Sequence, residues 1–247
     1  MLTLPPDMIA QRTISNMKDV RRNQQLARKT QTVAERFVAC YGFRPWRPHG
    51  APIEELVATI LSQHTSDTNS SRAFAELKRR FPTWPEVVSA PAADVAAAIQ
   101  IGGLANIKAP RIQAALRAAE TAFPAGAFDA LNRLPVNDAR AALLALPGIG
   151  PKTASCVLLF SLGIPAMPVD THVHRVARRI GILELKANAG SAHEILESRL
   201  NDDLDNVYSF HVNAVHHGRQ VCKARNPLCG QCCINDICDY VQNRNYD

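Results

Sequence analysis

Apolar residues recur at helical intervals along most of this chain, and proline or glycine separates the segments that carry them. In the stretch 53–61, which reads IEELVATIL, they fall at positions i, i+3, i+4, i+7 and i+8, the pattern of one buried helix face. Runs of alternating apolar and polar residues, which are typical of strands, are missing from the sequence. The sequence therefore predicts an all-α protein of short helices and tight loops.

The same criteria place the other helices. Pro52 and two glutamates stand where a helix start accepts proline and favours negative charge. Ser66 or Asp67 can cap a second helix. Further helical stretches are expected over residues 92–100, 108–122, 138–146, 151–162, 171–181, 191–200 and 205–218.

The length of the chain, 247 residues, allows one large domain or two small ones, and 47% hydrophobic residues indicate a globular protein. Pro165 and Pro168 mark a crossing between domains. The first 49 residues show no independent pattern, and we expect them to pack against the C-terminal part.

Charge limits the function only modestly. Lys and Arg number 28 against 22 Asp and Glu, a net charge of +6 that suits nucleic acid but also ordinary basic enzymes. The basic stretch 12–29 fits either an organelle transit segment or a solvated helix face. A glycine and two prolines break the longest uncharged stretch, 154–169, so no membrane span is expected. Residues 1–6 lack the pattern of a secretory signal.

Five of the seven cysteines lie between residues 222 and 238. Without a secretory signal, a metal site is favoured there over disulfides. Four thiolates suit zinc or an iron–sulfur cluster, and structural or reactive thiols remain an alternative. Zinc sites more often use two Cys-x2-Cys pairs, whereas this loop has one, which favours a 4Fe–4S cluster. Cys233 breaks the spacing and is expected to be a neighbour; the expected ligands are Cys222, Cys229, Cys232 and Cys238.

The segment 146–154, which reads LPGIGPKTA, lies between two apolar helices. Gly148 and Gly150 allow a tight turn and the close approach of a ligand to the backbone. Gly150 would cap the second helix, Pro151 would be its first residue and Lys152 its second. Free N–H groups at such a helix start can bind a phosphate oxygen, as in a helix-hairpin-helix motif that grips DNA. The alternative is a structural turn with a surface lysine.

Two residues can carry chemistry. The amine of Lys152 could act as a Schiff-base nucleophile, although most lysines at helix starts have no chemical role. Asp170 or Thr171 caps the helix that follows, and the simplest interpretation of Asp170 is that of a cap. Its carboxylate could also stabilise a cationic sugar or accept a proton.

Taken together, these motifs resemble the endonuclease III family of DNA glycosylases, within the helix-hairpin-helix superfamily, over roughly residues 50–240. The matching segments are 146–154, Val-Asp-Thr-His at 169–172, His-Gly-Arg at 217–219 and the four-cysteine loop. The resemblance implies an all-α fold of two helical domains with a DNA-binding groove between them. A six-helix domain with the hairpin would span 50–163, and 1–49 with 164–247 would form an iron–sulfur cluster domain.

The resemblance also implies a function, that of a bifunctional DNA glycosylase and AP lyase of base excision repair. Such an enzyme flips a damaged base, here an oxidised pyrimidine, out of the duplex. Lys152 matches the family's nucleophile, which attacks the sugar C1′, and Asp170 matches its catalytic aspartate. The four cysteines match the ligands of the 4Fe–4S cofactor, and Lys223 and Arg225 match a loop that contacts phosphates. The resulting Schiff base promotes β-elimination and strand cleavage.

Two loops match those that fill the gap left by the flipped base. Gln63 and His64 stand at the family's intercalating loop, where many bacterial members have Ala-Gln. Leu104 matches the wedge leucine, preceded here by an extra residue; the alternative is a core leucine. His174 and Asn213 replace residues that are usually apolar or aromatic in bacterial relatives, so the preferred lesion is open.

The expected partner is double-stranded DNA that carries a damaged base or an abasic site, bound by a monomer without a membrane. In a bacterium or archaeon, the expected location is the cytoplasm, in association with the nucleoid. In a eukaryote, it is the nucleus or an organelle. Three alternatives stand beside this hypothesis. They are a glycosylase for mismatched or alkylated bases, a non-catalytic DNA-binding module, and a zinc protein of unrelated function.

Overall fold

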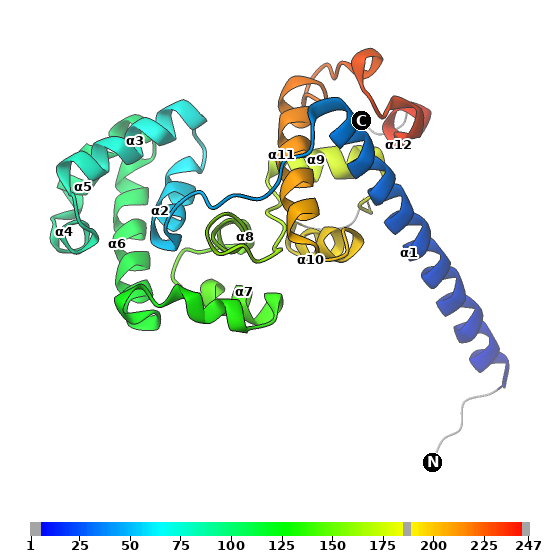
Figure 1. Ribbon diagram of the computed structural model, residues 1–247, viewed down its shortest axis with the longest axis horizontal. Helices are drawn as coiled ribbons and strands as arrows, with labels where there is room; N and C mark the ends of the chain where they lie inside the picture. Colours follow the sequence, from blue (N-terminus) through cyan, green and yellow to red (C-terminus); the bar gives the residue numbers. More distant parts are fainter. Residues whose placement is uncertain (1–5, 185–188, 244–247) are drawn as a thin grey trace. The chain divides into compact units, whose positions relative to one another are not determined.

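The computed structural model of the chain describes residues 6–184 and 189–243, and in these ranges it consists of helices and loops without a strand (Figure 1). The all-α prediction is thus confirmed. The chain divides into two compact units: one is Pro45–Pro168, and the other combines Met1–Arg44 with Val169–Asp247. These boundaries lie five residues from the positions set from the sequence, 49/50 and 163/164. No helix in the described ranges is both long and apolar enough to cross a bilayer.

The contiguous unit, Pro45–Pro168, contains a series of short helices. Their bounds are α2 Pro52–Ser62, α3 Asp67–Arg80, α4 Trp84–Ser89, α5 Ala92–Ala98, α6 Ala105–Ala122, α7 Val136–Leu144 and α8 Pro151–Cys156. The 3-10 turns η1 Gln100–Gly102, η2 Pro124–Gly126 and η3 Phe128–Arg133 connect them, and a π-helical turn, η4 Val157–Ser161, extends α8.

Helix α6 organises this unit because α2, α4 and α5 all pack against it (Figure 1). The core includes Leu56 and Ile60 from α2, Ile112 from α6 and Leu158 after α8, each fully shielded from solvent. Burying these side chains contributes about 1.5–3 kcal/mol each. The core thus fixes α6 against α2, which places the loops at their ends.

Local sequence explains where two of these helices begin. Ser66 caps α3, since its hydroxyl accepts a hydrogen bond from the Asn69 N–H at 3.3 Å. Helix α6 begins at Ala105, three residues before the predicted start, because Leu104 adopts a left-handed conformation with φ 53° and turns the chain into the helix. A left-handed leucine carries strain, which is often found at functional loops.

The second unit combines the two ends of the chain. Its helices are α1 Pro6–Tyr41, α9 Thr171–Ile180, α10 Ala189–Arg199, α11 Leu204–Gln220 and α12 Asp239–Asn243, with 3-10 turns η5 Cys229–Gln231 and η6 Asn235–Ile237. The long helix α1 is the main element that the sequence pattern did not place.

Helix α1 packs against α11 and α10, and α9 also packs against α11 (Figure 1). Phe37 of α1 lies against Phe210 of α11, with ring centroids 5.9 Å apart. Lys29 and Arg36 of α1 form ion pairs with Asp239 and Asp236 near the C-terminus. The part of α1 that contains Lys29, Arg36 and Phe37 therefore completes the core of the C-terminal part.

Candidate active site

The hairpin between α7 and α8 has the local geometry that the sequence predicts. Gly148 takes a left-handed conformation with φ 76°, Gly150 is the N-cap of α8, and Pro151 is its first residue. Ile149 is buried between the two glycines and anchors the turn in the core. Lys152 is therefore the second residue of α8, in the first helical turn where backbone N–H groups lack helical partners.

The charge of Lys152 acts on two ionisable groups of its own unit, Glu55 and Cys156. Burial raises the pKa of Glu55 on α2, while a hydrogen bond from Thr59 and the charge of Lys152 lower it. The Thr59 hydroxyl donates to a carboxylate oxygen of Glu55 at 3.2 Å. Burial raises the pKa of Cys156, one turn after Lys152, to about 11, and Lys152 and Thr59 again oppose the shift. The lysine thus lies beside a carboxylate and a neutral thiol.

Sequence reasoning missed Glu55. The available signal was a glutamate one position before the buried Leu56, with Thr59 one turn later on the same helix face. A charged residue beside the apolar stripe of a core helix needs a partner.

Asp170 lies in the other unit, at the start of α9. One of its carboxylate oxygens accepts a hydrogen bond from the Val173 N–H at 2.7 Å, and its backbone carbonyl accepts one from the His174 N–H at 2.9 Å. Its predicted role as a helix cap is confirmed. Its catalytic role stays a prediction.

The two loops predicted to fill the DNA gap both belong to the contiguous unit. Gln63 ends α2 and accepts a hydrogen bond from Arg111 of α6 at 2.9 Å. His64 is exposed, with φ 53°. Leu104 is 49% exposed and so is not a core leucine. Lys108 of α6 lies beneath both loops: it is 1% exposed and donates to the carbonyl oxygens of Leu61 and Gly102, each at 2.8 Å.

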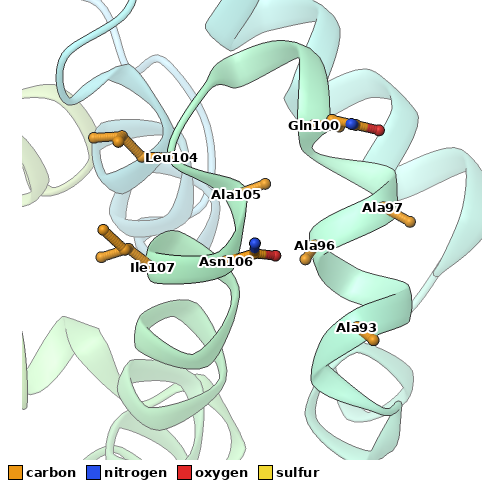
Figure 2. Close-up of a pocket in the computed structure, with 8 residues that line it drawn as sticks. All are labelled: Ala93, Ala96, Ala97, Gln100, Leu104, Ala105, Asn106 and Ile107. Carbon is orange, nitrogen blue, oxygen red and sulfur yellow. The ribbon is translucent and has the colours of Figure 1, made fainter.

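An open groove of about 580 Å³ adjoins Leu104, lined by residues of α5 and of the start of α6 (Figure 2). Figure 2 shows Leu104 and Ile107 extending to the same side of α6, whereas Asn106 extends towards α5. Ile107 is 54% exposed, so the two side chains form an apolar ridge on the surface. No motif in the sequence distinguishes Ile107 from a core residue.

The four predicted ligand cysteines line one small cavity in the second unit, together with Arg179, His217, Tyr240 and apolar residues. Cys233 is not among the residues that line it. Burial raises the pKa of Cys232 to about 11 and also raises that of Cys238, so bare thiolates would be costly here. Positively charged iron offsets that cost, and the donor set therefore fits an iron–sulfur cluster.

Within the part of the chain that the structure describes, no three His, Cys, Asp or Glu side chains converge as a single metal ion would require. Two observations support an iron–sulfur cluster instead of a single ion: the cavity that the four cysteines share and the chemistry of their thiols.

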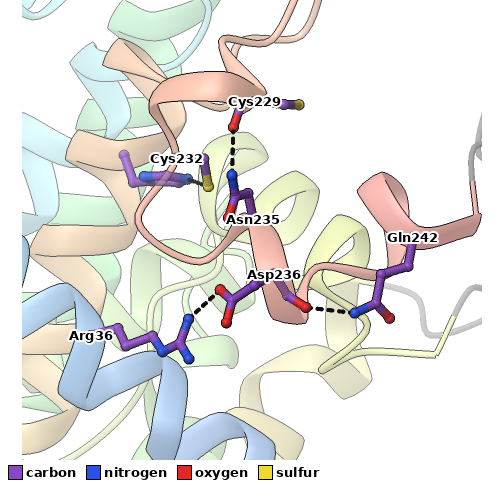
Figure 3. A network of polar contacts seen from close by, with 7 residues as sticks. Arg36, Cys229, Cys232, Asn235, Asp236 and Gln242 are labelled. Atoms are coloured by element: carbon purple, nitrogen blue, oxygen red, sulfur yellow. Dashed lines mark hydrogen bonds and ion pairs between the residues drawn. The ribbon is translucent and has the colours of Figure 1, made fainter.

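Polar contacts hold the cysteine loop in place (Figure 3). The Asn235 side chain donates to the Cys229 carbonyl at 3.5 Å, and the sulfur of Cys232 lies 3.6 Å from Nε2 of His217. Asp236 forms an ion pair with Arg36 of α1, and its carbonyl accepts a hydrogen bond from Gln242 at 2.6 Å. The loop is thus fixed to α1 as well as to α11.

Lys223 and Arg225, the predicted phosphate contacts, are exposed on the part of this loop between the first two cysteines. Arg179 of α9 supports that segment by donating to the carbonyl oxygens of Lys223 at 2.7 Å and Ala224 at 3.0 Å. Arg175 donates to the Cys222 carbonyl at 3.0 Å. The sequence did not reveal these supporting arginines.

Asn213, a departure from the expected family pattern, has a structural role. It is fully buried in α11, its amide donates to the Gly42 carbonyl at 3.0 Å, and its oxygen accepts from Nε of Arg44 at 3.0 Å. It therefore fastens the end of the first segment of its unit to α11.

Comparison with family models gives two matches. Residues 57–202 match the HhH-GPD superfamily base excision DNA repair protein model, and residues 222–238 match the iron–sulfur binding domain of endonuclease III. The second match begins and ends at the outer pair of the four cysteines.

Individual known proteins are also similar to this chain in sequence and in structure. A relative from Arabidopsis thaliana is 37% identical over 152 residues, which is 62% of this chain and 52% of that protein. Endonuclease III of Thermotoga maritima is 33% identical over 193 residues, 78% of this chain and 85% of its own length. A trapped endonuclease III–DNA covalent intermediate has a TM-score of 0.72 at 26% identity, covering 87% of this chain and 98% of that one.

Proposed function

Because the chain belongs to the endonuclease III family of base excision repair DNA glycosylases and binds a 4Fe–4S cluster, we propose that it is a bifunctional enzyme. It removes oxidised pyrimidines and then cleaves the strand at the abasic site. The observation that carries this proposal is Lys152 at the second position of α8, directly after the hairpin. A monofunctional glycosylase, which only hydrolyses the bond between the base and the sugar, uses water as its nucleophile and needs no amine at that position.

The reaction that we propose proceeds by covalent catalysis. The neutral amine of Lys152 attacks C1′ of the flipped nucleotide, and the bond from C1′ to the base breaks as the base takes the electron pair and a proton. The carboxylate of Asp170 stabilises the positive charge that develops on the sugar. The solved relative trapped as a covalent intermediate with DNA supports such a step.

The covalent adduct then supports strand cleavage. Loss of the amine proton and opening of the sugar ring give a Schiff base between C1′ and Lys152. This cation makes the 2′ proton acidic, a base removes that proton, and the C3′–O bond breaks with the phosphate as leaving group. Water finally hydrolyses the Schiff base and releases Lys152.

Other residues bind rather than react. We assign Cys222, Cys229, Cys232 and Cys238 as the ligands of the 4Fe–4S cluster, which supplies iron–thiolate bonds that close their loop. Gly148 and Gly150 contact phosphate through the backbone, and Lys223 and Arg225 contact it through their side chains. Gln63, His64 and Leu104 occupy the gap in the duplex. The enzyme acts as a monomer in the compartment that holds the DNA.

Borohydride trapping tests the proposal, because it reduces a Schiff base to a stable bond. Duplex DNA that carries thymine glycol, an oxidised pyrimidine, should give a covalent adduct with the wild type and none with Lys152→Ala. Lys78→Ala, which removes a half-buried lysine of the same unit that packs over Trp84, should trap normally. Base release without an adduct would instead support a monofunctional glycosylase for mismatched or alkylated bases, which mismatched duplexes would then identify.

A further inference from the structure

Arg111 of α6 connects two surfaces that the proposed function assigns to DNA. Its aliphatic stem runs directly across Gly148 of the hairpin, so closely that a Cβ at Gly148 would lie 2.7 Å from Cγ of Arg111. Its guanidinium then reaches the loop after α2, where Nη1 donates to Oε1 of Gln63 at 2.9 Å. One half-buried side chain thus contacts both the phosphate-binding turn and the gap-filling loop.

The hydrogen bond fixes which way the Gln63 amide faces. A side-chain amide has an acceptor end and a donor end that normally exchange by a half-turn. Here the oxygen is engaged by a charged donor, a stronger bond than one between neutral groups. The NH2 group of Gln63, with its two N–H donors, is therefore directed away from Arg111 and can donate to a group on the other side. A half-turn would place an NH2 group against the guanidinium and lose this bond.

We propose that Arg111 is a specificity-determining positioning residue, which holds Gln63 as a hydrogen-bond donor towards the base that faces the lesion. This inference rests on the proposed function for the placement of Gln63 against DNA. Without the guanidinium the amide can turn over and accept hydrogen bonds as readily as it donates them, so discrimination between opposite bases declines.

The scaffold beneath the two loops supports this role. Lys108 lies one turn before Arg111 on α6 and holds the carbonyl oxygens of Leu61 and Gly102. The backbone before Gln63 and the backbone before Leu104 are therefore both anchored to the helix that carries Arg111. The side chain of Gln63 is then the part that remains to be oriented, and Arg111 orients it.

Binding to an uncleavable abasic analogue provides the test without requiring catalysis. Duplexes with a tetrahydrofuran residue opposite guanine or opposite adenine give two dissociation constants, and their ratio measures discrimination. We expect a ratio that differs from 1 for the wild type and that moves towards 1, by up to about tenfold, for Arg111→Met. Arg117→Met is the matched control, since Arg117 is an exposed arginine of the same helix that donates to Val88 at 3.2 Å; it should keep the wild-type ratio.

A double-mutant cycle shows whether Arg111 acts through Gln63. Gln63→Ala should move the ratio as Arg111→Met does, and the double variant should match the single ones. Arg111→Lys keeps an aliphatic stem against Gly148 but lacks the guanidinium, so it should also move the ratio. This variant preserves the test if Arg111→Met does not fold. A wild-type ratio of 1, an unchanged ratio in both Arg111 variants, or a further shift in the double variant would overturn the inference. Borohydride trapping of the wild type tests the lyase chemistry without reference to the opposite base, so the two proposals fail separately.

Discussion

The ammonium group of Lys108 lies 2.8 Å from the carbonyl oxygen of Leu61, at the end of a helix 47 residues away in sequence. Lys108→Met would remove the donor from this carbonyl and from that of Gly102. Each buried acceptor that loses its partner costs about 1–3 kcal/mol. We expect a lower midpoint in urea denaturation, whereas Arg133→Met, at an exposed site of the same unit, should change it little. Equal midpoints for the two variants would contradict the anchoring role.

The second prediction concerns Glu55, whose pKa is raised by burial. The folded state holds this proton more tightly than the unfolded chain, so the free energy of unfolding decreases as pH rises from the ordinary glutamate range through the raised pKa. Glu55→Gln removes this dependence. The melting temperature of the variant minus that of the wild type should therefore increase with pH across that window and then level off. A difference that stays constant with pH would show that Glu55 titrates normally.

The third prediction separates two roles of Asp170. Asp170→Asn keeps a good N-cap but removes the charge, so excision from thymine glycol duplexes should fall by orders of magnitude while thermal stability hardly changes. Asp170→Ala should lose excision and also about 1 kcal/mol of stability, measured by urea denaturation. Full activity of the asparagine variant would leave the aspartate with its capping role only.

The fourth prediction concerns the cysteine loop. Cys229→Ala should lose the visible absorption of the cluster and make the C-terminal loop sensitive to protease, because metal binding is coupled to folding of the ligand segment. Cys233→Ala is the control beside it, and it should retain both the absorption and the resistance. If Cys233→Ala lost the absorption and Cys229→Ala kept it, Cys233 would be the cluster ligand and Cys229 its neighbour.

The fifth prediction concerns the salt dependence of binding to undamaged duplex DNA. Each phosphate neutralised contributes about 0.9 to the slope of log affinity against log salt. The double variant Lys223→Ala/Arg225→Ala should therefore flatten the slope by up to about 1.8. Arg21→Ala/Arg28→Ala makes the same charge change at exposed positions of α1. If only this second pair flattens the slope, the basic contact surface lies on α1.

The local sequence was sufficient for the capped helix starts and for the hairpin. Gly150, Pro151 and Asp170 act through backbone geometry within a few residues, so their positions could be predicted from spacing alone. The all-α class followed in the same way from the periodicity. Helix α1 could not be predicted because its buried apolar residues, Val33 and Phe37, lie near the end of a long and mostly polar helix. Its stability comes from packing against distant segments.

Long-range polar contacts were also beyond the sequence. Lys108, Arg111 and Arg179 look like surface cations in sequence, yet each holds a loop through carbonyl or amide oxygens that lie far along the chain. The charge of Lys152 acts on Glu55 only when α2 packs against α8. Motif spacing identifies groups that can react, whereas the residues that orient them are identified by tertiary contacts.

The unit that joins the two ends of the chain also imposes an order on biosynthesis. Lys29 and Arg36 emerge from the ribosome long before their partners Asp239 and Asp236, which follow 210 and 200 residues later. The packing of α1 is therefore completed only after the segment that contains Asp236 and Asp239 has been translated, while the contiguous segment Pro45–Pro168 can fold as soon as it has emerged. A chain released early by a premature stop codon would leave the apolar face of α1 uncovered, which marks it for chaperones and proteases.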